Sequence, residues 1–532
     1  MATAAAAHVE GPPLAQLDRL IWIGDIPSIG ASRYPDRPAI IFADRDRELT
    51  YAELDRSCDA FAAFLEERGI RGGDRVEYLG KNSDLYFPVL LGAIRAGVVV
   101  VPLNWRLTAA ELAYQLEDSR SKLLIHDAEF DAVARESARL TSAPPPLIPT
   151  EGEGITLGEV LSRPAAHRAA PHDKEQVLLQ IYTSGTTGRP KGVLISQYAL
   201  SLTRHAELTN PAFDHLSSGC RILSAMPNAH VGGMSWVLMG LVRFGTVVLT
   251  ADASPRSLLA LLRRYRADHC FMVPTVIRAL VDELARGEPA PELAGIYYGA
   301  MAMSESLLRE TLQIFRCAVI QFFGMTEIAG SATVLGPEDH DLAKPQLLRT
   351  VGKPYPGVGI EIRDPNRAVL PRGVPGEIWI RSPSVMLGYS NLPDKTAEAM
   401  VDGWYASGDG GFLDEDGYLH LTDRIKDLIV SGGENVYPAE VEEALRQHPA
   451  VLDAAVVAVA DDRWGEMVAA AVELRPEATV TAAELQQFAR GRIAAFKCPK
   501  LIHFVPQLPR TVSGKVQRAE VRRQLHEQRI AK

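Results

Sequence analysis

Cysteine is scarce in this sequence, and the cysteines that occur form no pattern. Five cysteines are spread over 532 residues, at Cys58, Cys220, Cys270, Cys317 and Cys498. Neither the CxxC spacing of a zinc site nor the density of a disulfide framework occurs. We therefore expect reduced thiols, as in the cytosol.

The sequence also lacks a basic excess and a long apolar run. Lys and Arg total 56 against 66 Asp and Glu, so the net charge of -10 leaves no electrostatic footprint for nucleic acid or an anionic membrane. The most hydrophobic stretch, Tyr86 to Leu103, is interrupted by Pro88, Arg95 and Gly97, and Met1 to Pro13 has no basic segment of a signal peptide. We expect a soluble, cytoplasmic protein.

What the chain does contain is enough apolar material, 47% of residues, for more than one hydrophobic core. Strand and helix patterns alternate over Ala39 to His126 and again over Arg221 to Phe323, which predicts parallel sheets with crossover helices. After Val351 short strands with Gly/Pro turns indicate a small β-rich subdomain. The clearest boundary lies at Asp423 to Gly433. We predict an N-terminal domain over 1–423, a hinge over 424–432 and a C-terminal domain over 433–532.

The stretch Tyr182 to Gly192, YTSGTTGRPKG, has the composition of a phosphate-binding loop. It follows an apolar run, Val177 to Ile181, that is typical of a buried strand, and it combines glycines, hydroxyls and Lys191. An ordinary glycine-rich hairpin is the alternative. A Walker A loop is disfavoured, because its lysine directly follows glycine and precedes a helix, whereas here Arg189 and Pro190 intervene and a strand-like GVLIS follows.

Eight segments in order resemble the motifs of the adenylate-forming superfamily, which includes acyl-CoA synthetases, adenylation domains and luciferases. They are YTSGTTGRPKG, PNAHVGG (227–233), YGAMAMS (298–304), QFFGMTE (321–327), WYASGDGG (404–411), DRIKD (423–427), SGGENVYPAEVE (431–442) and PRTVSGK (509–515). The resemblance covers nearly the whole chain. It implies an α/β fold, with a large N-terminal domain of mixed parallel sheets with flanking helices and a small β-rich subdomain. A small mobile α+β C-terminal domain would follow.

The family reaction joins a carboxylic acid to a thiol in two steps. The carboxylate attacks the α-phosphate of ATP to give an acyl adenylate and pyrophosphate, and coenzyme A then displaces AMP. The resemblance therefore implies ATP, Mg²⁺ and coenzyme A as cofactor and co-substrates. The implied partners are small molecules, with no nucleic acid and no integral membrane association, and a homodimer is left open.

The resemblance also assigns a nucleotide site. The residues expected to bind ATP or AMP are Thr183, Ser184, Gly185, Thr186, Thr187, Gly188, Lys191, Gly299, Ala300, Met301, Phe322, Phe323, Gly324, Met325, Thr326, Asp409, Arg424 and Lys515. Thr183 and Glu327 are expected to hold Mg²⁺, an ion that prefers oxygen ligands. The family usually has Tyr at position 323, so Phe323 keeps the stacking face and loses the hydroxyl. In isolation Glu327 reads as a helix-initiating acid and Asp409 as a turn former.

Three residues are expected to take part in catalysis: Lys515, His230 and Glu327. The Lys515 ammonium would bridge the carboxylate and the α-phosphate and reduce their repulsion. His230 would orient the carboxylate as a gate between acyl and nucleotide sites, although a lone histidine is more often structural. It is not expected to be a general base, because the acid is already ionised at neutral pH. The C-terminal domain would swing about the hinge residue Lys426 and present a CoA-binding segment. This segment comprises Ser431, Gly432, Gly433 and Glu434.

The residues around the gate predict a hydrophobic fatty, aryl or alicyclic acid as substrate. The acyl pocket is expected to be lined by His230, Met234, Ser235, Trp236, Tyr298 and Met303. We weigh an ATP-dependent carboxylic acid–CoA ligase against a stand-alone enzyme that loads a carrier protein. Amino-acid-activating members carry an Asp near the gate, and Pro227 to Trp236 contains none. A non-enzymatic nucleotide-binding protein is disfavoured because the catalytic positions are intact.

Overall fold

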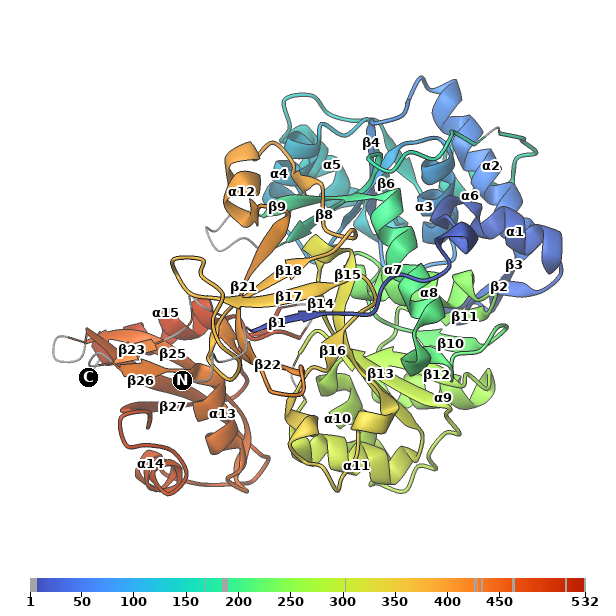
Figure 1. The fold of residues 1–532 in the computed structure, drawn as a ribbon. Helices are drawn as coiled ribbons and strands as arrows, with labels where there is room; N and C mark the ends of the chain where they lie inside the picture. Colours follow the sequence, from blue (N-terminus) through green and yellow to red (C-terminus); the bar gives the residue numbers. More distant parts are fainter. Residues whose placement is uncertain are drawn as a thin grey trace. The chain divides into compact units, whose positions relative to one another are not determined.

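The computed structural model describes residues 7–167, 169–183, 190–301, 303–424, 427, 429–431, 434–461, 465–511 and 514–530. Two compact units make up the chain. The large unit comprises Glu10–Gly359 and Arg381–Tyr405, and the small unit comprises Met1–Val9, Ile360–Ile380 and Ala406–Lys532. Strands and helices alternate through most of the large unit (Figure 1). The α/β class and the division into a large and a smaller domain agree with the sequence.

One sheet of the large unit, named the N-terminal sheet, has the strand order β19-β9-β8-β5-β4-β6-β7. Its strands are β4 (Arg75–Leu79), β5 (Val99–Leu103), β6 (Leu123–His126), β7 (Leu147–Pro149), β8 (Val177–Thr183), β9 (Lys191–Ser196) and β19 (Gly388–Tyr389). β4 pairs in parallel with β5 and β6, and β5 in parallel with β8. Their residues form near-continuous apolar runs, as expected for strands buried on both faces. β9 runs antiparallel to β8, so a strand follows Lys191, as predicted.

Two helices associated with the N-terminal sheet begin at capping boxes. Thr50 and Glu53 form a capping box at α2 (Tyr51–Glu67), and Thr108 with Glu111 forms another at α4 (Ala109–Ser119). Each cap satisfies backbone N–H groups that a helix start leaves without partners. The other helices of this region are α1 (Ile26–Arg33), α3 (Tyr86–Arg95), α5 (Asp131–Arg139) and α6 (Leu157–Ser162).

The second sheet of the large unit, named the central sheet, has the order β16-β15-β14-β13-β12-β10-β11-β2-β3. Its strands are β2 (Pro38–Phe42), β3 (Arg47–Thr50), β10 (Arg221–Ser224), β11 (Thr246–Leu249), β12 (His269–Met272), β13 (Gly295–Gly299), β14 (Ala318–Met325), β15 (Gly330–Leu335) and β16 (Lys353–Pro354). Along the chain β2 is followed by β3 and α2 and then by β4 of the N-terminal sheet. In the structure β2 pairs in parallel with β11, some two hundred residues later.

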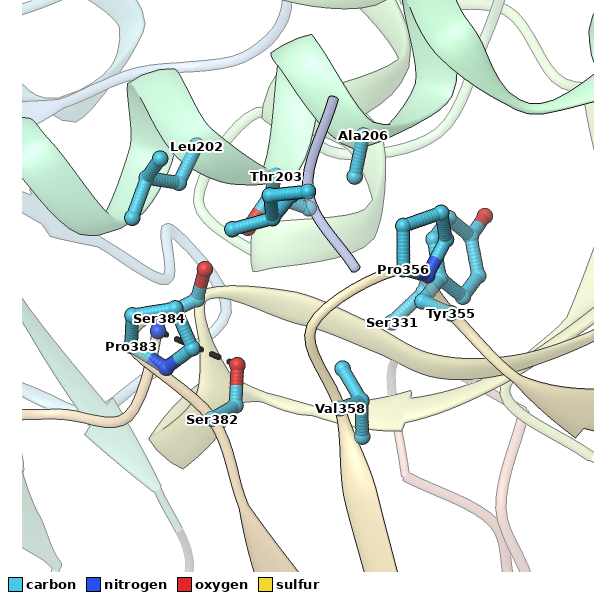
Figure 2. Close-up of a pocket in the computed structure, with 11 residues that line it drawn as sticks. Leu202, Thr203, Ala206, Ser331, Tyr355, Pro356, Val358, Ser382, Pro383 and Ser384 are labelled. Carbon is cyan, nitrogen blue, oxygen red and sulfur yellow. Dashed lines mark hydrogen bonds between the residues drawn. The ribbon is translucent and has the colours of Figure 1, made fainter. Parts of the chain in front are cut away.

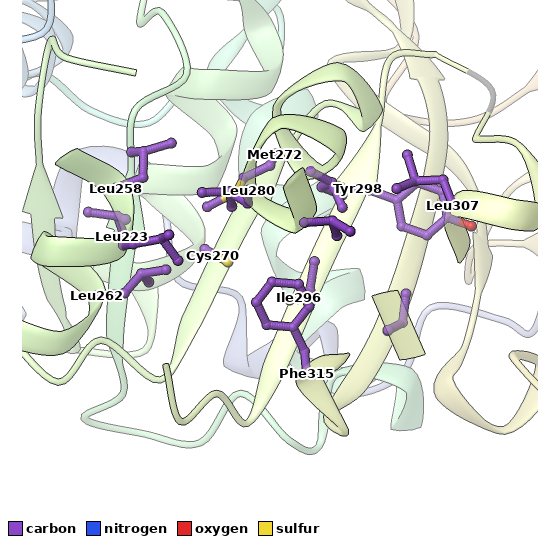
Figure 3. Close-up of a cluster of buried hydrophobic side chains, with 14 of the residues drawn as sticks. Leu223, Leu258, Leu262, Cys270, Met272, Leu280, Ile296, Tyr298, Leu307 and Phe315 are labelled. Atoms are coloured by element: carbon purple, nitrogen blue, oxygen red, sulfur yellow. The ribbon is translucent and has the colours of Figure 1, made fainter. Parts of the chain in front are cut away.

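Helices cover both faces of the central sheet. On one face α9 (Pro255–Arg264), α10 (Pro274–Leu284) and α11 (Glu305–Phe315) pack over an apolar core, shown in Figure 3. On the other face lies α8 (Val231–Val242), which donates from Trp236 Nε1 to the Leu223 carbonyl at 2.9 Å. α7 (Gln197–Thr209) and α12 (Pro393–Ala399) complete the helices of this unit, and β20 (Met400–Val401) pairs with the first residues of β21 (Trp404–Leu413).

The small unit has a β-rich part and an α+β part. The β-rich part contains β17 (Gly359–Arg363), β18 (Gly376–Arg381), most of β21 and β22 (Leu419–Arg424). The α+β part contains β23 (Ile429–Ser431), β24 (Glu434–Val436), β25 (Val451–Asp461), β26 (Gly465–Leu474), β27 (Leu501–Val505), α13 (Pro438–Arg446), α14 (Ala482–Arg490) and α15 (Arg518–Ile530). Cores line both faces of β25 and β26. The structure groups 360–380 and 406–423 with this unit, so the boundary at residue 423 stays a prediction.

The sequence predicts reduced cysteines and no membrane span. All five cysteines are free. No helix among the residues that the structure describes is long and apolar enough to cross a membrane.

Candidate active site

Lys191 and Glu327 are brought together in the large unit by a tyrosine that the sequence did not single out. Lys191 Nζ lies 4.5 Å from the centre of the Tyr389 ring. The Tyr389 hydroxyl donates to Glu327 Oε1 at 3.2 Å. Burial raises the pKa of Tyr389, and the Glu327 charge raises it further. The phenol therefore keeps its proton and acts as a hydrogen-bond donor. A cation and a carboxylate thus share one aromatic side chain.

The backbone holds these three residues from several sides. Tyr389 pairs with Val193 where β19 runs antiparallel to β9, and Ser390 N donates to the Gly192 carbonyl at 2.7 Å. Met386 N donates to the Glu327 carbonyl, also at 2.7 Å. Thr183 lies opposite Lys191 in the β8–β9 register. Thr183 and Lys191 therefore lie at one end of the β8–β9 pair, and Tyr389 links Lys191 to Glu327.

The carboxyl ends of β13 and β14 form the adjacent edge of the central sheet. Gly299 pairs with Phe322, and a Cβ at Gly299 would lie 2.7 Å from the Phe322 carbonyl oxygen, so only glycine fits there. Two non-glycine residues after these strands, Ala300 (φ 65°) and Ala329 (φ 54°), have left-handed backbone conformations. Such conformations are costly and cluster at functional sites. Strand carboxyl ends are also where open α/β sheets bind ligands.

The nucleotide candidates at these ends are differently buried. Phe323 is buried, whereas Phe322 is half-buried and packs against Phe213, Phe271 and Tyr297. The half-buried residues here also include Gly324, Met325 and Thr326, and Met301 follows the exposed Ala300. Glu327 lies in the 3₁₀ turn Thr326–Ile328 directly after β14. This position agrees with a residue at the start of a helical turn, and the role of Glu327 in the site stays a prediction.

His230 stands at the N-cap of α8 and is half-buried. Its backbone N–H donates to the Pro227 carbonyl at 3.0 Å, and its carbonyl accepts from Met234 N at 3.2 Å. A Cβ at Gly330 would lie 3.8 Å from Ser235 Oγ, which links the start of α8 to the strand that follows Glu327. The structure thus brings the gate region close to the turn that holds Glu327.

The candidates for the acyl pocket do not all face one space. Trp236 is buried on the α8 face of the central sheet, with its ring 4.8 Å from Tyr297. Tyr298, the next residue of β13, belongs to the core on the opposite face, where Met303 packs against the same cluster (Figure 3). The Tyr298 hydroxyl donates to Gln321 Oε1 at 3.0 Å. Because neighbouring strand residues point to opposite faces, Trp236 and Tyr298 cannot line one pocket together. His230, Met234 and Ser235 share the α8 side.

A small pocket of the large unit is lined by none of the predicted site residues, although its Ser331 is the strand partner of Gly324. α7 contributes Leu202, Thr203 and Ala206, and Figure 2 shows these facing the segments that carry Tyr355, Pro356, Val358, Ser382, Pro383 and Ser384. Ser384 N donates to Ser382 Oγ at 3.1 Å, and the lining side chains carry no charge. A pocket without a cation has no means to neutralise phosphates, so we do not assign it to ATP.

The small unit carries the remaining described candidates. Asp409 lies opposite Arg424 where β21 pairs with β22. Ser431 is buried at the end of β23. Lys515 is exposed, and a short bridge between Arg510 and Val516 holds the segment around it, with Thr511 N donating to the Lys515 carbonyl at 2.6 Å.

Part of the predicted site lies outside the described residues. This concerns Ser184, Gly185, Thr186, Thr187, Gly188, Lys426, Gly432 and Gly433, and the side chains of Arg424 and Glu434. Their roles stay predictions.

Comparison with known proteins decides the family. The AMP-binding enzyme model matches residues 29–390, and the model of the AMP-binding enzyme C-terminal domain matches residues 440–515. The chain belongs to the adenylate-forming acyl-CoA synthetase family.

Relatives and solved structures agree with this placement. A fatty acid–[acyl-carrier-protein] ligase, ScoC of Streptomyces coeruleorubidus, is 37% identical over 93% of this chain and 95% of its own length. A feruloyl-CoA synthase of an Amycolatopsis species is 36% identical over 89% of this chain and 94% of its own. The o-succinylbenzoate CoA synthetase MenE of Bacillus subtilis, solved with an acyl-adenylate intermediate, is 30% identical with a TM-score of 0.82, covering 93% of this chain and 97% of its own.

The oxygen donors of this acyl-CoA synthetase fit Mg²⁺. Among the described residues no group of three or more His, Cys, Asp and Glu side chains could hold a metal by itself. Mg²⁺ commonly uses one or two protein oxygens and completes its shell with substrate phosphates and water. The Glu327 carboxylate and the Thr183 hydroxyl would be such a donor set, since Thr183 lies opposite Lys191 and Tyr389 links Lys191 to Glu327.

Sequence reasoning missed the side chains that support this family site. Tyr389 is one, and the Tyr182 hydroxyl is another, donating to Asp118 Oδ2 at 2.7 Å. Asn391 Nδ2 donates to the Asp118 carbonyl at 2.8 Å. A third is Glu77, which is fully buried, so that its pKa is raised to about 8. A single acidic residue between apolar neighbours of a strand, as in RVEYL, is the one signal that the sequence offered for Glu77.

Proposed function

We propose that this acyl-CoA synthetase is an ATP-dependent carboxylic acid–CoA ligase that forms an acyl adenylate from a hydrophobic acid. Acid, ATP and coenzyme A are converted to acyl-CoA, AMP and pyrophosphate. The observation that carries the proposal is that Tyr389 contacts both Lys191 and Glu327. Lys191 lies opposite Thr183, and Glu327 follows the strand that pairs with Gly299.

Each of these residues has a part in managing charge. Lys191 attracts the terminal phosphates, and Glu327 with Thr183 holds Mg²⁺, which, when bound, neutralises part of the phosphate charge. His230 orients the acid at the start of α8. Lys515 of the small unit reduces the repulsion between carboxylate and α-phosphate as they approach. Asp409 accepts from the ribose hydroxyls, and Arg424 donates to ribose or phosphate.

The same unit would then serve the second step. Displacement of Lys515, by movement about Lys426, lets the segment from Ser431 to Glu434 approach the thiol substrate. Lid and domain movements of this kind often complete a catalytic site only for one step of a reaction.

The acid is an aryl, alicyclic or fatty acid. Met234 and Trp236 are fully or almost fully buried, and His230 and Ser235 begin the same helix, so the α8 side offers mostly apolar contact with a few polar groups. Such sites suit hydrophobic ligands. The feruloyl-CoA and o-succinylbenzoate relatives favour an aryl acid within this range.

A second candidate is the transfer of the acyl group to a carrier protein in place of coenzyme A. The 37% identity to a fatty acid–[acyl-carrier-protein] ligase favours it. The adenylation step is common to both candidates, so they differ only in the thiol that accepts the acyl group.

One experiment tests the proposal and separates its two forms. Purified protein is given ATP, Mg²⁺ and single acids, and AMP and the acyl product are measured with coenzyme A, with a phosphopantetheinylated carrier protein, and without a thiol. Acyl-CoA formed from aryl or fatty acids supports the ligase. Acylated carrier without acyl-CoA supports the second candidate. Absence of AMP with every acid and both thiols contradicts both.

A further inference from the structure

Tyr389 contacts the two charged residues of the predicted phosphate and magnesium site at once. Its ring faces the Lys191 ammonium, and its hydroxyl donates to the Glu327 carboxylate. We propose that Tyr389 is a positioning residue that keeps Lys191 and Glu327 apart and correctly oriented for magnesium-bound ATP. This inference rests on the proposed function, because that function gives Lys191 and Glu327 their ligands.

The first argument is chemical. A lysine and a glutamate that face the same small site attract each other, and a direct ion pair would occupy the groups that ATP and Mg²⁺ need. The tyrosine gives each group a different partner. The ring face attracts the ammonium only weakly, so a phosphate can replace it. The hydroxyl occupies only one acceptor position of Glu327, and a carboxylate has about four.

The second argument is the rigidity of Tyr389 itself. Its side chain is only 7% exposed, and its backbone is paired to β9 at Val193. Ser390 N, in the next residue, donates to the carbonyl of Gly192, which directly follows Lys191 in the chain. Tyr389 N also donates to Thr396 Oγ1 at 2.9 Å. The ring is therefore fixed to the same strand that carries Lys191.

The third argument is that hydrogen bonds to Asp118 hold the turn that follows Tyr389. Asn391 donates to both the backbone and the side chain of Asp118, at 2.8 and 3.1 Å. The same Asp118 carboxylate accepts from Tyr182, on the strand that leads into the phosphate loop. The turn after Tyr389 and the strand before the loop thus share one aspartate. A displacement of either would be transmitted to the other.

Two substitutions separate the two contacts. Tyr389→Phe keeps the ring over Lys191 and removes the donor to Glu327. Tyr389→Leu removes both. Glu327→Gln reports the effect of losing the carboxylate itself, and Tyr265→Phe, whose exposed hydroxyl contacts Asp46, is a matched control. Circular dichroism and thermal melting check that each variant is folded.

The readout is binding and not turnover alone. ATP affinity is measured by calorimetry without a divalent ion, and Mn²⁺ binding in the presence of ATP by electron paramagnetic resonance. We expect Tyr389→Phe to weaken Mn²⁺ binding about tenfold, the lower end of the effect of removing a group that orients a metal ligand. Metal-free ATP affinity should change less than about twofold, since an exchange of a tyrosine for a phenylalanine leaves the cation–ring contact in place. Tyr389→Leu should lose both affinities, and Tyr265→Phe neither.

The outcomes distinguish this inference from the proposed function. Mn²⁺ binding that is weakened by Glu327→Gln and unchanged by Tyr389→Phe would overturn the positioning role and leave the proposed function intact. Equal losses of metal-free ATP affinity in Tyr389→Phe and Tyr389→Leu would also overturn it, because the ring would then contribute nothing. Mn²⁺ binding unchanged in Glu327→Gln would overturn the positioning role and the assignment of Mg²⁺ to Glu327, whereas the proposed reaction is tested separately by AMP formation. If Tyr389→Leu does not fold, the Tyr389→Phe result decides.

Discussion

The large and small units hold their predicted charged site residues in different ways. In the large unit Lys191 and Glu327 are both in contact with Tyr389, which is itself fixed by strand pairing and by hydrogen bonds. In the small unit Lys515 is an exposed lysine on a short bridged segment. A preorganised group suits a ligand that is held throughout a reaction. An exposed one suits a group that acts in one step and is then withdrawn.

The largest effect is expected from a substitution in the small unit, at Lys515. Lys515→Ala removes a charge that acts on the reacting atoms, and we expect acid-dependent pyrophosphate release to fall about 10³-fold, as for other groups that stabilise transition-state charge. Transfer from a supplied acyl adenylate to coenzyme A should change far less. Lys497→Ala, which removes an ion pair with Glu440 and a contact with the Phe496 ring, is the control. Equal losses in both half-reactions would argue against a lysine that serves one step.

A second prediction concerns the rigid interior of the large unit. Glu77 has its pKa raised by burial from 4.5 to about 8, so the folded protein binds a proton there that the unfolded chain releases between those values. Stability should therefore fall as pH rises through this window and stay lower above it, by ~1.4 kcal/mol per unit of pKa difference.

The measurement compares urea midpoints at pH 5 and pH 8.5. Glu77→Gln has no proton to lose and can still accept from the Ser119 hydroxyl, which lies 2.6 Å from Glu77 Oε1. We expect its midpoint to change less between the two pH values than that of the native protein. Glu48→Gln, at an exposed position, should retain the native difference. A native-like pH dependence in Glu77→Gln would show that another group is responsible.

A third prediction sharpens the contrast between the two lysines. Lys191→Ala should raise the ATP concentration for half-maximal pyrophosphate release about tenfold, the factor that corresponds to ~1.4 kcal/mol. The loss should be smaller than that of Lys515→Ala, since Lys191 neutralises the leaving phosphates and does not contact the attacking carboxylate. Steady-state kinetics over a range of ATP concentrations measures it. A Lys191 effect as large as that of Lys515 would remove the distinction.

The smallest expected effect concerns the adenine side. Phe323→Tyr restores the hydroxyl that the family usually carries, at a buried position. One added hydrogen bond is worth about 0.5–1.5 kcal/mol net, so the affinity for ATP should change by less than about tenfold. Calorimetry with ATP measures it. A larger change would mean that the native phenylalanine has a role beyond stacking.

Local patterns predicted much of the fold, and long-range pairing explains what they missed. The capping box at Thr50 and the strand after Lys191 follow from nearby residues alone. The parallel pairing of β2 with β11 joins segments some two hundred residues apart, which no local pattern reports. The same holds for Tyr389, which approaches Lys191 only because β19 pairs with β9.

The candidate site shows the same limit. The motifs named Lys191 and Glu327, and the structure adds the side chain between them. Apolar composition suggested a pocket that included both Trp236 and Tyr298, but the alternation of side chains along β13 puts Tyr297 beside Trp236 and Tyr298 in the opposite core. The chemical character of a site can be predicted from single residues, whereas the face of the sheet on which each side chain lies depends on the strand register.

The most direct test of the account is the acid-dependent exchange of labelled pyrophosphate into ATP without any thiol. If the large unit holds ATP for attack by a carboxylate, a suitable aryl or fatty acid alone will support exchange, and Lys515→Ala will abolish it. If exchange requires coenzyme A or a carrier protein, or proceeds equally well without Lys515, an acyl adenylate formed with the help of this lysine is contradicted.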